Sequence, residues 1–269
     1  MPIEVINANY IDYLNSPFCS YFDLIIADPP FNIGQKYNGF NDKISDSEYR
    51  TFTRDWIIAC WNKLKPGSAF VLHGSIEASR VIIVCLDELK LEPLIECEIC
   101  WAYNFGQHTY NNFIQTHCRA IILRKPGEHR KWNETANMVP SKRLLMGDTR
   151  TTTAKYKGMV PIGTVWGVEC NDDGLVTEPI NGLPNWGRVQ GNNGERRQGH
   201  PNQLPENYCS RFIAAYSNEN DIVFDPFGGS GTTAICCKKM NRQCKTTEIG
   251  DWNCVSIKTS LQKLENVKL

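Results

Sequence analysis

The sequence predicts an α/β protein with a mostly parallel central sheet covered by helices. Short apolar runs bounded by turn residues alternate with stretches of helical periodicity, a pattern typical of this class. Two of the runs end in polar turns, Asp28-Pro29-Pro30-Phe31 and the glycine-rich stretch from Asp225 to Thr233. Because ligands bind at the carboxyl ends of the strands in an open α/β sheet, we expect both turns to face one cleft.

The expected elements follow in chain order. Apolar runs with turn residues at their ends predict strands at Phe22–Ala27, Ala69–His73, Ile95–Tyr103, Ala120–Arg124, Asp221–Phe224 and Gln243–Thr247. Helices are predicted at Ser45–Leu64, Pro205–Tyr216, Ser230–Lys239 and Asp251–Leu264. We expect Ser45 or Ser47 to cap the first of these helices and Pro66-Gly67 to end it.

Composition indicates a globular protein. Hydrophobic residues make up 41% and charged residues 22% of the 269 residues, and no apolar run approaches the length of a membrane span. Residues 1–15 lack the features of a signal peptide, so the expected location is the cytoplasm, where the scattered cysteines would be reduced. Cys97 and Cys100 alternate within a strand pattern, so no metal site is expected.

The region from about residue 126 to residue 199 breaks the alternation of strands and helices. It is rich in glycine, asparagine, threonine and charge and is too long for an ordinary loop, so we expect a functional insertion. The net charge of the chain is zero, yet residues 124–157 hold nine basic and three acidic residues. This asymmetry indicates a surface that attracts a polyanion, although a solvated loop rich in lysine and arginine would have the same composition.

The glycine-rich turn has the composition of a ligand-binding loop. Gly228, Gly229 and Gly231 remove side chains where a ligand would approach the backbone. The dinucleotide fingerprint and the Gly-Lys-Ser/Thr of a phosphate loop are both absent from the sequence. The next strand leads to Glu248, whose carboxylate can accept both hydroxyls of a ribose. A tight packing turn with an exposed glutamate is the alternative.

The Asp28-Pro29-Pro30-Phe31 turn suits an amino group on a nucleobase. Prolines fix the backbone and supply no N–H, so the Asp28 carboxylate and the Pro29 carbonyl can accept both amino hydrogens. Accepting both frees the nitrogen lone pair to attack an electrophilic methyl group. The Phe31 ring can stack on the same base, a contact worth about 1–3 kcal/mol. An ordinary turn remains the alternative for this motif alone.

Together these motifs resemble the DNA amino-methyltransferases that use S-adenosylmethionine, in the β-class order with the catalytic tetrapeptide first and the cofactor loop last. The resemblance rests in the catalytic part on Asp23–Gly34, Tyr37, Phe40–Asp42, Trp56 and Leu64–Ser68. In the cofactor part it rests on His200–Pro205, Asp225–Thr233 and Glu248. It implies a circularly permuted Rossmann-like methyltransferase fold, with a catalytic half at 1–125, a target-recognition insertion at 126–199 and a cofactor-binding half at 200–269. Aspartate at the head of the tetrapeptide favours adenine N6 as the target, and cytosine N4 is the alternative.

The resemblance also assigns site residues. The flipped base would be held by Asp28, Pro29, Pro30 and Phe31. The cofactor would be bound by Asn9, Asp28, His200, Asn202, Gln203, Asp225, Phe227, Gly228, Gly229, Ser230, Gly231, Thr232 and Glu248. The sequence departs from the family pattern at three places: Leu204 replaces a lysine, Asn9 replaces an aspartate, and Thr246-Thr247 replaces a small strand end before Glu248.

Double-stranded DNA is the partner that the resemblance implies, and the target base must leave the stack to react. The loop that holds Lys36, Tyr37 and Phe40 has the composition to guard the pocket. Candidates for DNA contacts in the insertion are Arg188, Arg196 and Arg197. A homodimer and a cognate restriction enzyme are further expected partners. An RNA methyltransferase and a catalytically silent nucleic-acid-binding module are the remaining alternatives.

Overall fold

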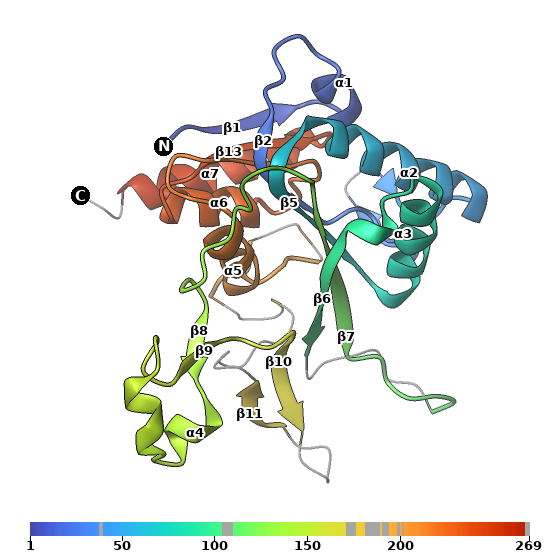
Figure 1. Ribbon diagram of the computed structural model, residues 1–269. Helices are drawn as coiled ribbons and strands as arrows, with labels where there is room; N and C mark the ends of the chain where they lie inside the picture. The colour runs from blue at the N-terminus through green and yellow to red at the C-terminus, as the bar shows by residue number, and fades with distance from the viewer. Residues whose placement is uncertain are drawn as a thin grey trace.

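The computed structural model has a nine-stranded sheet at its centre (Figure 1). It describes residues 1–37, 40–103, 110–170, 176–180, 189, 194–197, 200 and 202–266, with the backbone alone for 36, 37, 40, 168–170, 176–180 and 266. The order of strands in the sheet is β1-β13-β12-β2-β5-β7-β6-β10-β11. Five of these eight neighbouring pairs are parallel, which confirms the predicted, mostly parallel sheet.

The strands of this sheet are β1 (Ile3–Asn7), β13 (Gln243–Glu248), β12 (Ile222–Asp225), β2 (Phe22–Ala27), β5 (Leu64–Gly74), β7 (His117–Arg124), β6 (Ile95–Ala102), β10 (Val165–Cys170) and β11 (Val176–Ile180). Two hairpins lie outside it: β3 (Lys36–Tyr37) with β4 (Phe40–Asn41), and β8 (Met138–Pro140) with β9 (Met159–Pro161). The helices are α1 (Tyr10–Leu14), α2 (Asp46–Lys63), α3 (Ile76–Glu88), α4 (Lys142–Leu145), α5 (Glu206–Tyr216), α6 (Thr232–Lys239) and α7 (Asp251–Asn266), with 3-10 turns at Glu92–Leu94 and Thr149–Thr153. Each predicted strand and helix is present, with its ends shifted by a few residues.

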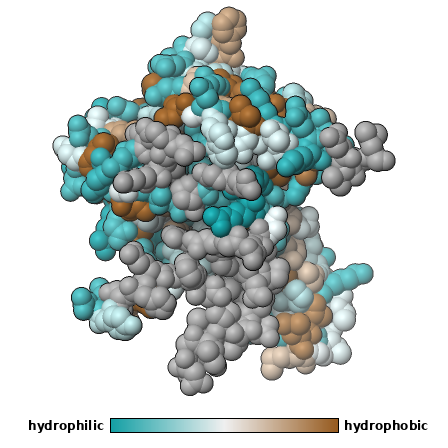
Figure 2. All heavy atoms as spheres, turned by 180° about the vertical axis from the view of Figure 1, so that it is seen from behind, coloured by the Kyte–Doolittle hydropathy of each residue, from teal (hydrophilic) through white to brown (hydrophobic). Residues whose placement is uncertain are grey.

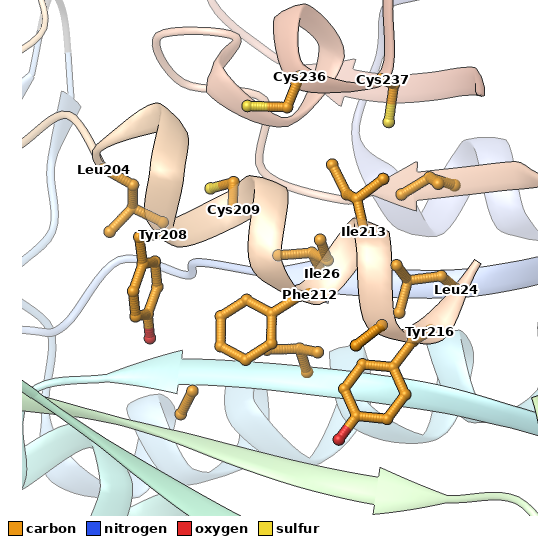
Figure 3. Close-up of a cluster of buried hydrophobic side chains, with 14 of the residues drawn as sticks. Leu24, Ile26, Leu204, Tyr208, Cys209, Phe212, Ile213, Tyr216, Cys236 and Cys237 are labelled. Carbon is orange, nitrogen blue, oxygen red and sulfur yellow. The ribbon is translucent and has the colours of Figure 1, made fainter. Parts of the chain in front are cut away.

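Helices cover both faces of the parallel strands, so the core has three layers (Figure 1). Successive side chains of β2 point to opposite faces: Ile25 lies in one buried cluster with Trp56 of α2, and Ile26 lies in another with Ile213 of α5. Figure 3 shows α5 laid across Leu24 and Ile26 through its apolar face. Burying each such side chain contributes about 1.5–3 kcal/mol, which fixes the sheet between its helices.

The first long helix begins as predicted but ends earlier. The Ser45 side chain accepts a hydrogen bond from the Glu48 amide, and the Glu48 carboxylate accepts one from the Ser45 amide, which together form a capping box. The prediction that Pro66-Gly67 ends the helix is wrong, because both residues lie inside β5. Gly67 has a φ of +76°, and a Cβ atom there would lie 1.9 Å from the carbonyl oxygen of His129. The glycine therefore permits a close approach between two backbone segments.

The chain after β7 crosses the amino ends of the parallel strands before it leaves the sheet. Lys131 Nζ lies 2.8 Å from carboxylate oxygens of both Asp23 and Asp221. Burial alone would raise the pKa of Asp23, but hydrogen bonds from Lys131, Lys65 and a backbone amide outweigh it and lower the pKa. Asn133 donates to two backbone carbonyls at the end of α5. Residues 126–137, which we call the strap, are thus anchored to the sheet.

The lobe, which we define as residues 138–161, follows the strap and carries the β8–β9 hairpin, α4 and a 3-10 turn. Apolar atoms gather on it in the lower right of Figure 2, where Leu145, Met146 and Val160 are exposed. After the lobe the chain returns to the sheet, because β10 pairs in parallel with β6 and Trp166 is buried. None of the described helices is long and apolar enough to cross a membrane.

Candidate active site

The carboxyl ends of five parallel strands line a cavity of about 630 Å³, a size typical of small-molecule sites. The residues at or just beyond these strand ends are Asn9, Glu248, Asp225, Asp28 and His73. The tetrapeptide turn and the glycine-rich turn therefore line one cavity, although they lie far apart in sequence. This is the arrangement that the two strand-end motifs predict.

The tetrapeptide is held rigidly between β2 and α2. Asp28 directly follows the fully buried strand β2, and the Pro30 carbonyl accepts a hydrogen bond of 3.0 Å from the Tyr49 hydroxyl. Beyond it Asn32 is buried with a φ of +60°, and its side-chain oxygen accepts the Ile44 amide at 2.8 Å. These contacts fix the turn without using the Asp28 carboxylate, which faces the cavity.

Carboxylates give the cavity a negative character. Burial raises the pKa of Asp28 well above its ordinary range, and the nearby Asp225 carboxylate adds to the effect. Burial also raises the pKa of Asp225 to about 6, although hydrogen bonds from Thr233 and the Phe227 amide oppose the change. Glu248 lines the same cavity. Such a site favours a positively charged ligand, which would relieve the cost of ionising these groups.

The glycines of the second turn are required by packing as well as by space for a ligand. A Cβ atom at Gly228 would lie 2.5 Å from the Thr246 hydroxyl oxygen, and one at Gly231 would lie 2.8 Å from the Ile257 side chain. Gly231 also has a φ of +79° as the N-cap of α6. The packing interpretation and the ligand interpretation of this turn are therefore compatible.

Glu248 is oriented by two backbone amides. One carboxylate oxygen accepts the Gly229 amide at 2.8 Å, and the other accepts the Gly250 amide at 2.9 Å. Each oxygen has a second lone pair that can accept a ligand hydroxyl. The turn thus presents a fixed carboxylate to the cavity, which fits the predicted contact with a ribose.

An aromatic wall lies at another part of the cavity. The Phe227 ring centroid is 5.2 Å from that of Tyr10 and 6.0 Å from that of Phe52, and all three residues line the cavity. Asn9 lies next to this wall in sequence and caps α1 by accepting the Ile11 amide at 3.0 Å. Its amide group can still donate to a ligand, so the wall and Asn9 could hold a heterocyclic ring.

The segment before α5 closes the cavity over the glycine-rich turn. A Cβ atom at Gly229 would lie 2.9 Å from His200 Nε2, and burial lowers the pKa of His200. Gln203 also lines the cavity, but its amide group clamps its own segment by accepting the Arg197 amide at 2.8 Å and donating to the Glu195 carbonyl at 2.7 Å. The remaining predicted cofactor residues that line the cavity are Asn202, Ser230 and Thr232.

Of the predicted DNA contacts, the structure describes the side chains of Arg196 and Arg197. The Arg197 side chain is only 10% exposed, and its guanidinium pairs with Glu206 at 2.6 Å and donates to the Thr232 hydroxyl at 3.0 Å. This burial contradicts a direct DNA contact by Arg197, which instead holds the start of α6. Arg196 is exposed, whereas Arg188 lies outside the described residues. The side chains of Lys36, Tyr37 and Phe40 also lie outside them.

Sequence reasoning missed the aromatic groups beside Asp28. His73 is only 2% exposed at the end of β5, and its ring centroid lies 5.9 Å from that of Phe31. His73 Nδ1 is 2.8 Å from the hydroxyl of Tyr208 on α5. The available signal was the position of His73 at the end of a predicted strand, at the same sheet edge as Asp28. The contact with Tyr208 had no local signal in the sequence.

Comparison with known proteins gives matches over most of the chain. A family model described as DNA methylase matches residues 22–259. The type II methyltransferase M.HpaI of Haemophilus parainfluenzae is 28% identical over 247 residues, which cover 90% of this chain and 68% of that protein. The DNA adenine methyltransferase YhdJ of Escherichia coli (strain K12) is 27% identical over 249 residues, which cover 90% of this chain and 76% of that protein.

Solved structures share the fold. The M1.HpyAVI–SAM complex has a TM-score of 0.62 at 20% identity and covers 96% of this chain and 98% of its own. The PvuII DNA methyltransferase, described as cytosine-N4-specific, has a TM-score of 0.62 at 16% identity and covers 99% of this chain and 92% of its own. These likenesses confirm the predicted Rossmann-like fold.

Proposed function

The chain belongs to the DNA methylase family that matches residues 22–259, and we propose that its target is the N6 amino group of an adenine flipped out of double-stranded DNA. The position of Asp28 on the cavity wall, beside Phe31 and within electrostatic reach of Asp225, is the observation that carries this proposal. In the family that the sequence resembles, aspartate at this position favours adenine. The match to a relative named as an adenine methyltransferase supports the same target.

The enzyme depends on S-adenosylmethionine, which supplies an electrophilic methyl group when bound. The residues present fit this molecule, because a sulfonium and an ammonium group are the cationic chemistry that the acidic cavity favours. We assign Asp225 to the ammonium group, Glu248 to the ribose hydroxyls and the wall of Tyr10, Phe52 and Phe227 to the adenine ring.

Asp28 and Pro29 orient the target amino group. Their carboxylate and carbonyl oxygens accept its two hydrogens, so that the nitrogen lone pair is directed away from the turn and towards the rest of the cavity. Phe31 stacks on the base and keeps the ring in place. Donation from the amino group also stabilises the ionised form of Asp28, which burial alone disfavours. The same carboxylate then accepts the proton that the methylated nitrogen releases.

Cytosine N4 methylation is the second candidate within the same family. Its amino group has similar geometry, and a neighbour of the same fold is described as specific for cytosine N4. The distinguishing experiment is incubation of the enzyme with isotope-labelled S-adenosylmethionine and mixed-sequence duplex DNA, followed by mass spectrometry of the nucleosides. We expect labelled N6-methyladenine. Labelled N4-methylcytosine alone would overturn the adenine assignment, and RNA included as a competitor would reveal methylation of RNA.

We propose two partners beyond DNA, a cognate restriction enzyme and a second copy of this chain. Relatives named as type II methyltransferases support a role beside a cognate restriction enzyme that cleaves the same sequence. A homodimer and a cytoplasmic location rest on the family resemblance and the composition. Incubation of methylated and unmethylated copies of the target sequence with the candidate nuclease would test the pairing with a restriction enzyme. Light scattering at several protein concentrations would test the homodimer.

A further inference from the structure

His73 lies next to the proposed amino-group acceptor. Strands β2 and β5 pair in parallel with Ala27 opposite Leu72. The residues that follow these two, Asp28 and His73, are therefore neighbours at the carboxyl edge of the sheet. Both residues line the cavity. A base with its amino group at Asp28 and its ring on Phe31 would therefore present one ring edge to the imidazole.

Tyr208 holds this imidazole from the side of α5. The Tyr208 hydroxyl lies 2.8 Å from His73 Nδ1, and the Tyr208 ring packs with its centroid 5.0 Å from that of Trp101. Figure 3 shows the Tyr208 ring directed away from α5 with its oxygen towards the neighbouring strand. Tyr208 is itself buried, and burial raises its pKa well above the ordinary value, so the hydroxyl keeps its proton. Either atom of this pair can be the donor. When the hydroxyl donates to Nδ1, the proton of the neutral imidazole is on Nε2.

The chemistry of adenine complements that donor. The carbon that bears the N6 amino group is flanked by ring nitrogen N1, an acceptor on the same Watson–Crick edge. We propose that His73 Nε2–H donates to N1 of the flipped adenine and that Tyr208 is the positioning residue that fixes the donating tautomer. This inference rests on the proposed adenine target. It makes His73 the residue that reads the ring edge while Asp28 holds the amino group.

A base analogue can test this contact without altering the protein. Duplex DNA with 1-deazaadenine at the target position, opposite an abasic site, lacks the N1 acceptor, and 7-deazaadenine opposite the same abasic site is the matched control with N1 intact. Single-turnover methylation by the wild-type enzyme should be about 10-fold slower with 1-deazaadenine, the loss of one neutral hydrogen bond, and nearly unchanged with 7-deazaadenine. Equal rates with the two analogues would overturn the proposal.

Substitution of His73 should remove the sensitivity to N1. His73→Phe should slow methylation of ordinary adenine about 10-fold, and 1-deazaadenine should then cause no further loss. A purely structural role for His73 predicts instead that the two changes multiply, which would contradict the contact. Tyr208→Phe should reduce the 1-deazaadenine effect to a few fold, because the tautomer is no longer fixed. Calorimetry with S-adenosylmethionine would show whether each variant keeps a formed cavity, and if His73→Phe does not, the wild-type analogue comparison decides.

The outcome separates this inference from the proposed function. Detection of N4-methylcytosine as the product would overturn the adenine assignment irrespective of His73. Detection of N6-methyladenine with rates indifferent to 1-deazaadenine would preserve the function and overturn the His73 contact.

Discussion

The cavity and the lobe differ in how their charged groups are accommodated. In the cavity, Asp28 and Asp225 are carboxylates whose pKa values are raised by burial. In the lobe, charged groups remain in water: the Asp148–Arg150 pair has an arginine side chain that is 82% exposed. The Lys155 side chain, which pairs with Glu134, is 71% exposed. Ionised groups in the cavity therefore carry a desolvation free energy, whereas those in the lobe stay hydrated and carry little.

This difference indicates which parts of the enzyme can change. The buried carboxylates of the cavity destabilise the free protein and are offset only when a ligand binds. Substitutions in the cavity should therefore reduce activity strongly and reduce the stability of the fold little. An exposed charge contributes little to folding, so substitution of the lobe's basic residues should change stability little. A family whose members catalyse one reaction at different target sequences would benefit from a constant cavity and a variable lobe.

The largest expected effect is on catalysis by Asp28→Ala. Removal of the amino-group acceptor should slow single-turnover methylation by about a thousandfold or more, equivalent to about 4 kcal/mol of transition-state stabilisation. The affinity for S-adenosylmethionine, measured by calorimetry, should stay within a few fold of wild type. Asp87→Ala on the exposed face of α3 is the control and should change neither quantity. Near-normal turnover of the Asp28 variant would remove the basis of the proposed mechanism.

Asp225→Asn should stabilise the fold and weaken the binding of S-adenosylmethionine. The folded-state pKa of Asp225, about 6, lies above its ordinary value of 3.8, so this group stabilises the fold below pH 4 and loses that contribution as pH rises through 6. The asparagine side chain does not ionise, so the variant does not lose stability in this pH range. The difference in free energy of unfolding between variant and wild type should therefore increase by up to about 3 kcal/mol from pH 4 to pH 7. Urea denaturation without cofactor measures it. A gain that is independent of pH would contradict the assignment.

The same variant tests the cofactor contact. S-adenosylmethionine should bind more weakly to Asp225→Asn at pH 7.5, because the ammonium group loses its carboxylate partner. For the wild type, affinity should fall as pH decreases through 6, where Asp225 becomes protonated. Calorimetry at pH 5.5 and 7.5 would measure both changes. Unchanged affinity in the variant would exclude Asp225 from the binding site.

Lys131→Met should destabilise the fold from outside the cavity. The change leaves Asp23 and Asp221 without a shared cation at the buried amino ends of the strands. We expect the free energy of unfolding to fall by about 2 kcal/mol, because Asp23 keeps its contact with Lys65. Lys155→Met in the exposed pair is the matched control and should leave the urea midpoint unchanged. Equal effects of the two substitutions would break the contrast between sheet and lobe.

The smallest effect on stability is expected from the double variant Lys142→Ala and Arg143→Ala. Both residues are exposed on α4 of the lobe, so the free energy of unfolding should change by no more than about 0.5 kcal/mol. DNA affinity should fall, and the slope of its logarithm against the logarithm of salt concentration should become shallower by about 1–2. An unchanged slope would assign the lobe no phosphate contact.

The predicted and missed features differ in the range of the contacts that create them. Apolar runs and the Ser45 cap are local patterns, and so are the two strand-end turns; the sheet direction then brings those turns to one edge without further information. The inward direction of Arg197 depends on Glu206 and Thr232, which come from other elements. The contact between His73 and Tyr208 joins residues 135 positions apart. Glu206 is nine positions from Arg197, but Thr232 is 35 positions away, so no pattern within a window of ten residues encodes the Arg197–Thr232 or the His73–Tyr208 contact.

The glycine at position 67 shows the same limit. Its place after a proline indicated a turn that ends the helix. The structure uses it instead where β5 passes beneath the carbonyl of His129. The glycine could be recognised from the sequence, but the reason for it is a contact with His129, some sixty residues later in the chain.

The strap bears on how target specificity could be transplanted between enzymes of this fold. A graft cut at residue 125 would carry Lys131 and Asn133 away with the donor lobe and leave Asp23 and the end of α5 facing foreign side chains. Asn137 also donates to the Arg211 carbonyl of α5. A junction placed after residue 137 would keep all three contacts with the recipient. The boundary of the proposed target-recognition region would then lie about a dozen residues beyond the point where the sequence composition changes.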